Sequence, residues 1–116
     1  MQFDNNIPLY IQIIERFKLD IAKNIYSSGE KLKSVRDFAI DFGVNANTVQ
    51  KALSKLEEEN LIYTERTVGK FITRDEQLLE SLKKEIPTNI TKLYIKEMKD
   101  ILISNDQILN FIKENL

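Results

Sequence analysis

Residues 34–56 read SVRDFAIDFGVNANTVQKALSKL, a pattern that predicts two short helices joined by a tight turn. Ser34 can cap the first helix, and Asp37 stands three residues later, where it would close a capping box. Gly43 follows at the position where a residue with positive φ would end that helix. Asn45 is a favourable cap for the second helix. The stretch therefore predicts a helix-turn-helix motif.

The second helix of this pair is predicted to be amphipathic. Val49, Ala52, Leu53 and Leu56 share one side at helical spacing and form a stripe expected to be buried. The opposite side offers amide, hydroxyl and amine groups suited to base edges in a major groove, near a helix N-terminus that favours phosphate. Three acidic residues at positions 57–59 would repel a duplex, so the N-terminal half is expected to dock. Taken alone, this polar face is equally well explained as a solvated surface.

A hairpin is predicted directly after this helix. Residues 61–65 and 70–74 are rich in β-formers, and the segment Arg66–Gly69 between them supplies a turn. Such a hairpin is a wing, and Arg66, Lys70 and Arg74 give it positive charge suited to phosphate or a minor groove. A plain sheet edge blunted by charges is the alternative. Residues 31–32 are expected to form a short strand that pairs with the wing.

Three closely spaced motifs carry a family resemblance. They are GxKLxSxRDxA from Gly29, GVNxNTVxxALxxLE from Gly43, and GxFI from Gly69, the last preceded by Leu-Ile at positions 61–62. Together they resemble the winged-helix domain of the GntR family of bacterial transcription regulators, over roughly residues 7–74. The wording VNxNTV and the short tail look most like the YtrA-type branch of that family.

The resemblance implies a set of DNA contacts from three parts of the motif. Arg36 would contact the DNA backbone or a guanine edge from the first helix, and the second helix and the wing would supply the remaining contacts. Lys33 stands where the family usually has Pro and would add a phosphate contact, whereas Ala46 lacks a contact often made there by Arg. The predicted DNA-binding residues are Lys33, Ser34, Arg36, Asn45, Asn47, Thr48, Gln50, Lys51, Arg66, Thr67, Gly69 and Lys70.

Composition excludes several classes of function. The chain of 116 residues contains no Cys and no His, so disulfides, thiolate or imidazole zinc sites and Cys or His catalysis are excluded. No glycine-rich phosphate loop and no paired nucleophile and base are visible, so we expect neither an enzyme nor a metal or cofactor site. The net charge is −1, and residues 1–75 hold 11 Lys or Arg against 11 Asp or Glu. DNA binding must therefore depend on how the charges are distributed.

No targeting or membrane-spanning segment is predicted. No apolar run approaches the ~20 residues of a membrane span, and the first six residues lack a basic region followed by an apolar one. We expect a cytoplasmic protein with no membrane partner.

The parts outside the motif are predicted to be helical. An apolar stripe predicts a first helix over residues 7–26, with Pro8 in its first turn and Ile25 on its buried face. Pro87 is expected to end a helix over residues 76–86, and a second one would run from about residue 88 to 103. Ser104 and Gln107 have the spacing of a capping box for a last short helix. The predicted fold class is mainly α with a small β-hairpin, a winged helix-turn-helix domain at residues 1–74 followed by an α-helical dimerisation segment at 75–116.

The tail carries more apolar side chains than a pair of helices can hide. Its length is near the ~40 residues below which a lone domain rarely folds. A core shared with the same segment of a second copy is the favoured solution, and docking onto its own winged helix is the alternative. The predicted dimerisation residues are Leu93, Tyr94, Met98, Ile101, Leu102, Leu109, Phe111 and Ile112.

These features together predict a sequence-specific, homodimeric DNA-binding regulator of transcription that represses from an inverted-repeat operator. Double-stranded DNA is the expected partner. The alternative is a winged helix used as a protein-interaction module in a larger assembly, in which residues 47–55 would face protein. The YtrA-like resemblance implies control of membrane-transporter genes. The tail is too short to enclose a sizeable pocket of its own, and the sequence identifies no effector.

Overall fold

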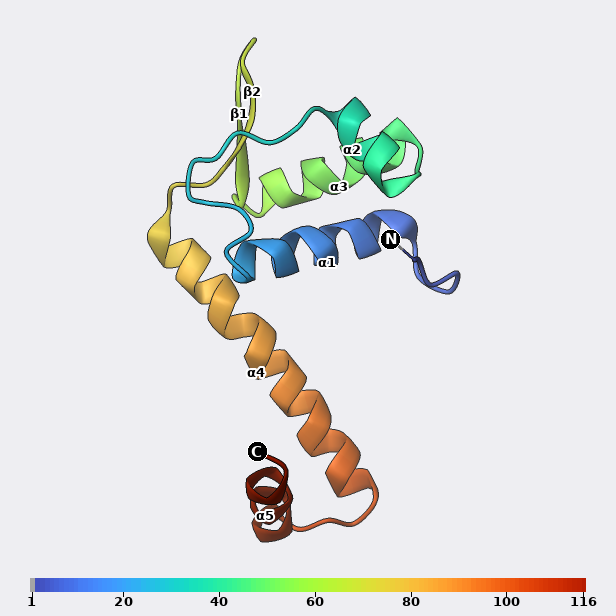
Figure 1. The fold of residues 1–116 in the computed structure, drawn as a ribbon, viewed down its shortest axis with the longest axis vertical. Coiled ribbons are helices and arrows are strands. Elements are labelled where there is room, and N and C mark those ends of the chain that lie inside the picture. The colour runs from blue at the N-terminus through green and yellow to red at the C-terminus, as the bar shows by residue number, and fades with distance from the viewer. Residues whose placement is uncertain (1) are drawn as a thin grey trace. The chain divides into compact units, whose positions relative to one another are not determined.

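The computed structural model describes residues 2–116, which form five helices and one antiparallel hairpin (Figure 1). The chain divides into two compact units, of which the first ends at Lys83 and the second runs from Lys84 to Leu116. The predicted fold class is confirmed, whereas the functional boundary after residue 74 stays a prediction. In chain order the elements are α1 (Leu9–Ala22), α2 (Val35–Phe42), α3 (Ala46–Glu58), β1 (Ile62–Glu65), β2 (Gly69–Ile72), α4 (Glu76–Asp100) and α5 (Asn105–Asn115).

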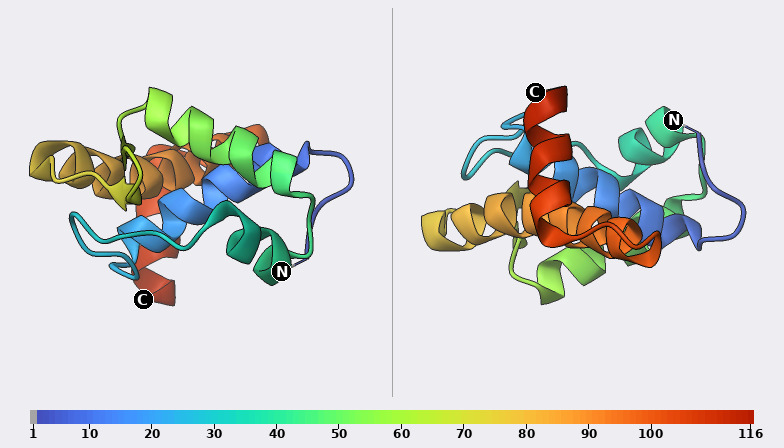
Figure 2. Two further views of the ribbon diagram at one scale, coloured as in Figure 1. Left: turned by 90° about the horizontal axis from the view of Figure 1, so that it is seen from above. Right: turned by 90° about the horizontal axis from the view of Figure 1, so that it is seen from below.

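The core of the first unit lies between α1 and α3, which lie side by side (Figure 2). Ile13, Phe17 and Ile21 project from α1 at spacings of four residues, and all are buried. The Phe17 ring meets the edge of Phe38 on α2 at a centroid distance of 5.0 Å. The predicted stripe on α3 is confirmed, because its four members are fully buried: Val49, Ala52, Leu53 and Leu56.

The helix-turn-helix is set by local hydrogen bonds. The predicted caps at Ser34 and Asn45 are present, but among the hydrogen bonds of residues 2–116 Asp37 does not return the bond that would complete a capping box. Ser34 Oγ accepts a hydrogen bond from the Asp37 amide at 3.1 Å and caps α2. Gly43 ends α2 with φ of 67°, and the Val44 amide donates to the carbonyl of Ala39 at 3.0 Å. Asn45 Oδ1 then accepts from the Asn47 amide at 2.8 Å and caps α3. These hydrogen bonds set where α2 begins and ends and where α3 begins.

Helix α1 is shorter than predicted. It ends at Ala22 because Asn24 adopts a left-handed φ of 62°, and the Ile25 amide donates to the carbonyl of Asp20 at 2.9 Å. Asn tolerates this conformation better than most residues, so the chain can turn here without glycine. Ile25 consequently lies outside the helix and is 56% exposed, and its predicted place on the buried face was wrong.

The hairpin is present, but its turn differs from the prediction. Ile62 pairs with Ile72, both are buried, and the rings of Tyr63 and Phe71 stack at 5.4 Å. The left-handed residue of the turn is Thr67, with φ of 66°, while Gly69 already belongs to β2. The short strand predicted at residues 31–32 is a single bridge from Lys31 to Phe71.

Helix α4 passes through Pro87 without a break, which contradicts the prediction of two helices. A proline inside a helix lacks one amide donor. At Pro87 the carbonyl of Lys83 therefore has no amide donor from within the helix, and the rest of α4 continues on both sides. The hydroxyls of Thr88 and Thr91 donate to the carbonyls of Lys84 and Pro87, each at 2.7 Å. In the first unit, Leu79 and Leu82 of α4 are buried. The helix ends at Asp100, three residues before the predicted end, and Leu102 follows with φ of 66°.

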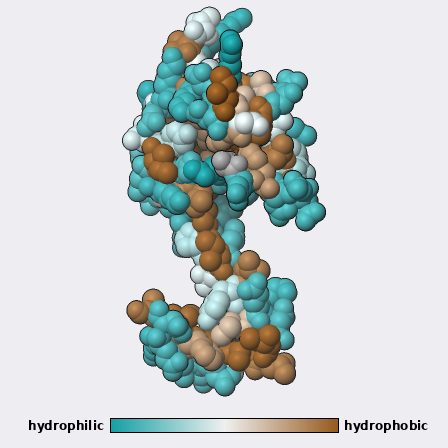
Figure 3. Space-filling model, turned by 45° about the vertical axis from the view of Figure 1, so that its right-hand side comes forward, coloured by the Kyte–Doolittle hydropathy of each residue, from teal (hydrophilic) through white to brown (hydrophobic). Residues whose placement is uncertain are grey.

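The second unit leaves most of its apolar side chains in contact with water. The predicted capping box of Ser104 and Gln107 is confirmed and starts α5. Within residues 84–116, Ile108 is the one buried side chain. By contrast, Leu93 is 58% and Leu102 91% exposed. Figure 3 shows apolar side chains at the surface of this unit. No helix within residues 2–116 combines the length and apolarity needed to cross a membrane.

Candidate nucleic-acid interface

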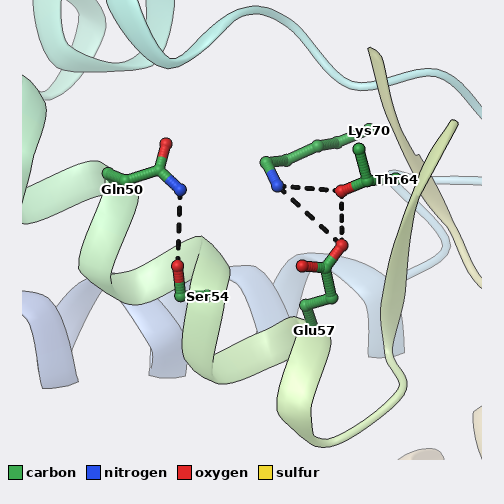
Figure 4. A network of polar contacts seen from close by, with 5 residues as sticks. All are labelled: Gln50, Ser54, Glu57, Thr64 and Lys70. Atoms are coloured by element: carbon green, nitrogen blue, oxygen red, sulfur yellow. Dashed lines mark hydrogen bonds and ion pairs between the residues drawn. The ribbon is translucent and has the colours of Figure 1, made fainter. Parts of the chain in front are cut away.

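The exposed face of α3 carries polar side chains at its N-terminal half. Asn47, Gln50 and Lys51 are exposed, and Thr48 is half-buried. Gln50 Nε2 donates to Ser54 Oγ one turn further along the same face at 3.3 Å (Figure 4). The amide and amine groups suited to base edges therefore lie together on one surface of one helix.

The other predicted contacts flank this helix. Figures 1 and 2 show α2 beside the N-terminal end of α3 and the hairpin at its C-terminal end. Lys33, Ser34 and Arg36 thus belong to the first flank, and the wing residues to the second. Lys33, Arg36 and Arg66 are exposed. Within residues 2–116, Arg36 and Arg66 make no ion pair, so their charges are available to an external anion.

Lys51 is held by a residue that the sequence did not indicate. Its Nζ lies 4.0 Å from the centroid of the Tyr10 ring, which projects from the first turn of α1. An ammonium over the face of an aromatic ring is stabilised by the quadrupole of the ring. Tyr10 thereby joins the candidate interface from 41 residues earlier in the chain, a distance over which no local pattern could have found it.

Lys33 has an internal partner as well. Its Nζ lies 2.6 Å from Oδ2 of Asp41, and both side chains are exposed. The hydrogen bond and the charge of Asp41 raise the pKa of the Lys33 ammonium above its usual value. To make the predicted phosphate contact, the Lys33 ammonium would therefore have to break its hydrogen bond to Asp41 or bind the phosphate and the carboxylate together.

The wing is joined to α3 through three polar side chains (Figure 4). Lys70 Nζ on β2 donates to Thr64 Oγ1 on β1 at 3.0 Å and lies 3.9 Å from Oε1 of Glu57 on α3. The hydroxyl of Thr64 in turn donates to the same Glu57 oxygen. Glu57 was expected only to lie away from DNA. In the structure it neutralises a lysine of the predicted interface.

The remaining wing residues shape the turn. Thr67 Oγ1 donates to the carbonyl of Arg66 at 2.6 Å, and Gly69 packs against the Lys31 side chain. A Cβ on Gly69 would lie 3.1 Å from Cε of Lys31, and the glycine has φ of 145°. Gly69 therefore has a backbone role here, while a contact from Gly69 to DNA stays a prediction.

The segment that holds this surface matches a known family. Residues 9–72, more than half of the chain, match the bacterial regulatory proteins of the gntR family. The chain belongs to the GntR family. It is 30% identical over 97% of its length to YhcF of Bacillus subtilis, an uncharacterised HTH-type transcriptional regulator, and covers 93% of that protein. It is 41% identical to the HTH-type transcriptional repressor YtrA of the same species, but this match spans 61% of the chain and 55% of YtrA.

Solved structures of GntR-like proteins share the fold. A GntR family transcriptional regulator from Listeria monocytogenes is 37% identical and superimposes with a TM-score of 0.91, covering 97% of this chain and 98% of that one. The DNA-binding domain of AraR, solved in complex with its operator ORX1, is 25% identical and superimposes with a TM-score of 0.55. That match covers 58% of this chain and 81% of the AraR domain. This GntR-family chain is a DNA-binding regulator of transcription with a winged helix-turn-helix, and not an enzyme.

Proposed function

We propose that the protein is a cytoplasmic, sequence-specific repressor that binds an inverted-repeat operator as a homodimer, and that it belongs to the YtrA-like branch. The observation that carries the proposal is the capped pair α2 and α3, which leaves the polar N-terminal half of α3 exposed. The printed name of the relative YtrA, a repressor, supports the direction of control. Control of transporter genes stays a prediction from the resemblance.

The proposed reading of DNA divides the work between base edges and phosphates. Asn47 and Gln50 have amides that can make paired hydrogen bonds with adenine, and Lys51 can reach the acceptors of guanine. Arg36, Thr48 and the wing would hold the backbone and fix the register of α3 in the major groove. The wing contributes Arg66, whose charge has no internal partner among the described ion pairs, and Lys70, whose charge has one.

The proposed dimer rests on the exposed apolar surface of the second unit. Of the eight predicted dimerisation residues, Tyr94 and Met98 are half-buried within the single chain and the other six are exposed. Exposed apolar patches of this kind on proteins mark interfaces. A second copy of the same segment would cover them symmetrically, as in most homo-oligomers.

A salt titration tests the DNA-binding surface. We expect the intact protein to bind labelled duplex DNA in fluorescence anisotropy, with log K falling linearly as log salt rises. Arg36→Gln and Arg66→Gln should each lower the magnitude of the slope by about one unit. Gln is the matched change because it keeps most of the side-chain length and removes the charge. The same substitution at Arg16, which pairs with Asp20 on α1, is the control and should leave the slope unchanged.

The titration also separates this proposal from the protein-interaction module. A module of that kind would show negligible affinity for random and genomic duplexes even at low salt. In that case residues 47–55 would be sought in a protein interface instead.

A further inference from the structure

Two lysines of the candidate interface are each paired with a carboxylate of the same chain. Lys33 lies against Asp41 beside α2, and Lys70 lies against Glu57 at the base of the wing. We propose that Asp41 and Glu57 tune the affinity for DNA, because their carboxylates compete with DNA phosphates for these two ammonium groups. The inference rests on the proposed phosphate contacts of Lys33 and Lys70.

The pairs are placed where competition can occur. The side chains of Lys33 and Asp41 are 61% and 47% exposed, so a phosphate oxygen can approach the ammonium without displacing any packed group. Glu57 and Lys70 are 39% and 20% exposed, and Lys70 keeps a second partner in the hydroxyl of Thr64. Removing the Glu57 carboxylate would therefore leave Lys70 held near its present place by a neutral group.

The pairs are also weak enough to exchange: both side chains of the Lys33–Asp41 pair are exposed, and the charged atoms of the less exposed Lys70–Glu57 pair are 3.9 Å apart. Exposed ion pairs between flexible side chains contribute little to stability, since water and salt screen them. A phosphate can replace a carboxylate as the partner of an ammonium, because both are anionic oxygen acceptors. Each internal carboxylate thus lowers the net gain from a phosphate contact. The affinity is lowered equally for every DNA sequence, because contacts to the DNA backbone carry no base information.

The charge balance of the chain suggests that this competition weakens binding to random DNA. Residues 1–75 hold equal numbers of basic and acidic side chains, and the chain as a whole is at −1. A regulator with few uncompensated cations binds random DNA weakly, because non-specific binding is almost entirely electrostatic. Base contacts from α3 then supply a larger share of the binding free energy at the operator.

Neutral, nearly isosteric variants test the proposal. Asp41→Asn and Glu57→Gln should each raise affinity for random and operator duplexes by the same factor, roughly two- to fivefold at low salt. Glu59→Gln is the matched control, since it makes the same change of charge at the same end of α3. Its partner is Lys18 on α1, at 3.1 Å, which is not a predicted DNA contact. We expect no gain from Glu59→Gln beyond about 1.5-fold.

Double variants identify the route of the effect. In a Lys70→Gln background, Glu57→Gln should no longer raise affinity, and Asp41→Asn should likewise lose its effect beside Lys33→Gln. A gain that persists without the lysine, or that Glu59→Gln matches, would overturn the proposal, because general charge relief would then explain it. A loss of affinity in Glu57→Gln with unchanged thermal unfolding would also overturn it, since Glu57 would then hold the wing in its binding position.

The titration of the wild type distinguishes a failure of the proposed function from a failure of the inference about Asp41 and Glu57. Binding of the wild type with a linear salt dependence supports the proposed function whatever the variants do. If the wild type and the variants Asp41→Asn, Glu57→Gln and Glu59→Gln all fail to bind duplex DNA at low salt, the proposed function and the inference are both wrong.

Discussion

At the scale of single residues, Asn47 is the side chain on which base recognition is expected to depend most. Its backbone amide is taken by the cap of Asn45, while its side-chain amide makes no hydrogen bond within residues 2–116. Asn47→Ala should cost ~1–3 kcal/mol on the operator and relax preference at one base pair. Anisotropy titrations with the operator and with single-base-pair variants measure both effects.

The control for this change is Gln77→Ala, which removes an exposed amide from α4 in the first unit. It should leave affinity and preference as they are. Should Asn47→Ala leave site selection unchanged while Arg66→Ala abolishes it, the wing reads the sequence and α3 does not.

Tyr26 gives the stability a dependence on alkaline pH. Burial raises the pKa of its phenol above the ordinary 10.0, and the carboxylates of Asp20 and Glu30 raise it further. The folded state therefore holds this proton more tightly than the unfolded state does. The contribution of Tyr26 to the free energy of unfolding is complete below pH 10 and falls as the pH rises from 10 to the folded pKa.

Urea unfolding at pH 8 and at pH 10.5 measures this fall. Tyr26→Phe keeps the ring and removes the proton, so its free energy of unfolding should fall less over the same range than that of the wild type. An equal fall in both proteins would assign the alkaline loss to other groups.

At the scale of elements, the turn between α2 and α3 depends on the conformation of Gly43. The residue has φ of 67°, and a Cβ added there would meet no atom within 4 Å. Gly43→Ala should thus destabilise the protein through backbone strain alone, by about 1–2 kcal/mol. Gly43→Asn should cost less, because Asn adopts the left-handed conformation more readily. Urea unfolding of the two variants gives the comparison, and equal losses would mean that the turn fails for another reason.

At the scale of the whole molecule, the first compact unit extends beyond Arg74 to Lys83, which decides where the chain can be truncated. Leu79 and Leu82 of α4 are buried in the first unit, so a chain cut after Arg74 would lose part of its own core. A chain cut after Lys83 should remain folded and monomeric. Its affinity for a full operator should drop steeply, since the second half-site no longer benefits from effective concentration.

Sedimentation of the intact chain tests the dimer directly. We expect a dimer at micromolar concentration. The operator of such a dimer should contain two half-sites whose centres are spaced by ~10 base pairs or a multiple. Circular dichroism of the truncated chain is the control for folding. A monomeric intact chain at that concentration would remove both the dimer and the inverted-repeat expectation.

The sequence by itself determined the features that act within a few residues of the backbone. The caps at Ser34, Asn45 and Ser104 and the left-handed Gly43 are local, because a side chain or a missing Cβ satisfies or frees its own neighbours. The buried stripe of α3 followed from helical spacing alone. The polar face of α3 was predictable for the same reason, since it is the opposite side of that stripe.

Only the tertiary structure decided how the interface is held. Lys51 lies over Tyr10, and Lys70 lies near Glu57, through contacts between residues far apart in the chain. No local pattern encodes such a pair, because it depends on how α1, α3 and the wing pack. The continuity of α4 through Pro87 is a further feature that the local rule for proline did not predict. Local chemistry therefore set where α3 begins, and long-range packing set the partners of Lys51 and Lys70, two residues of the predicted interface.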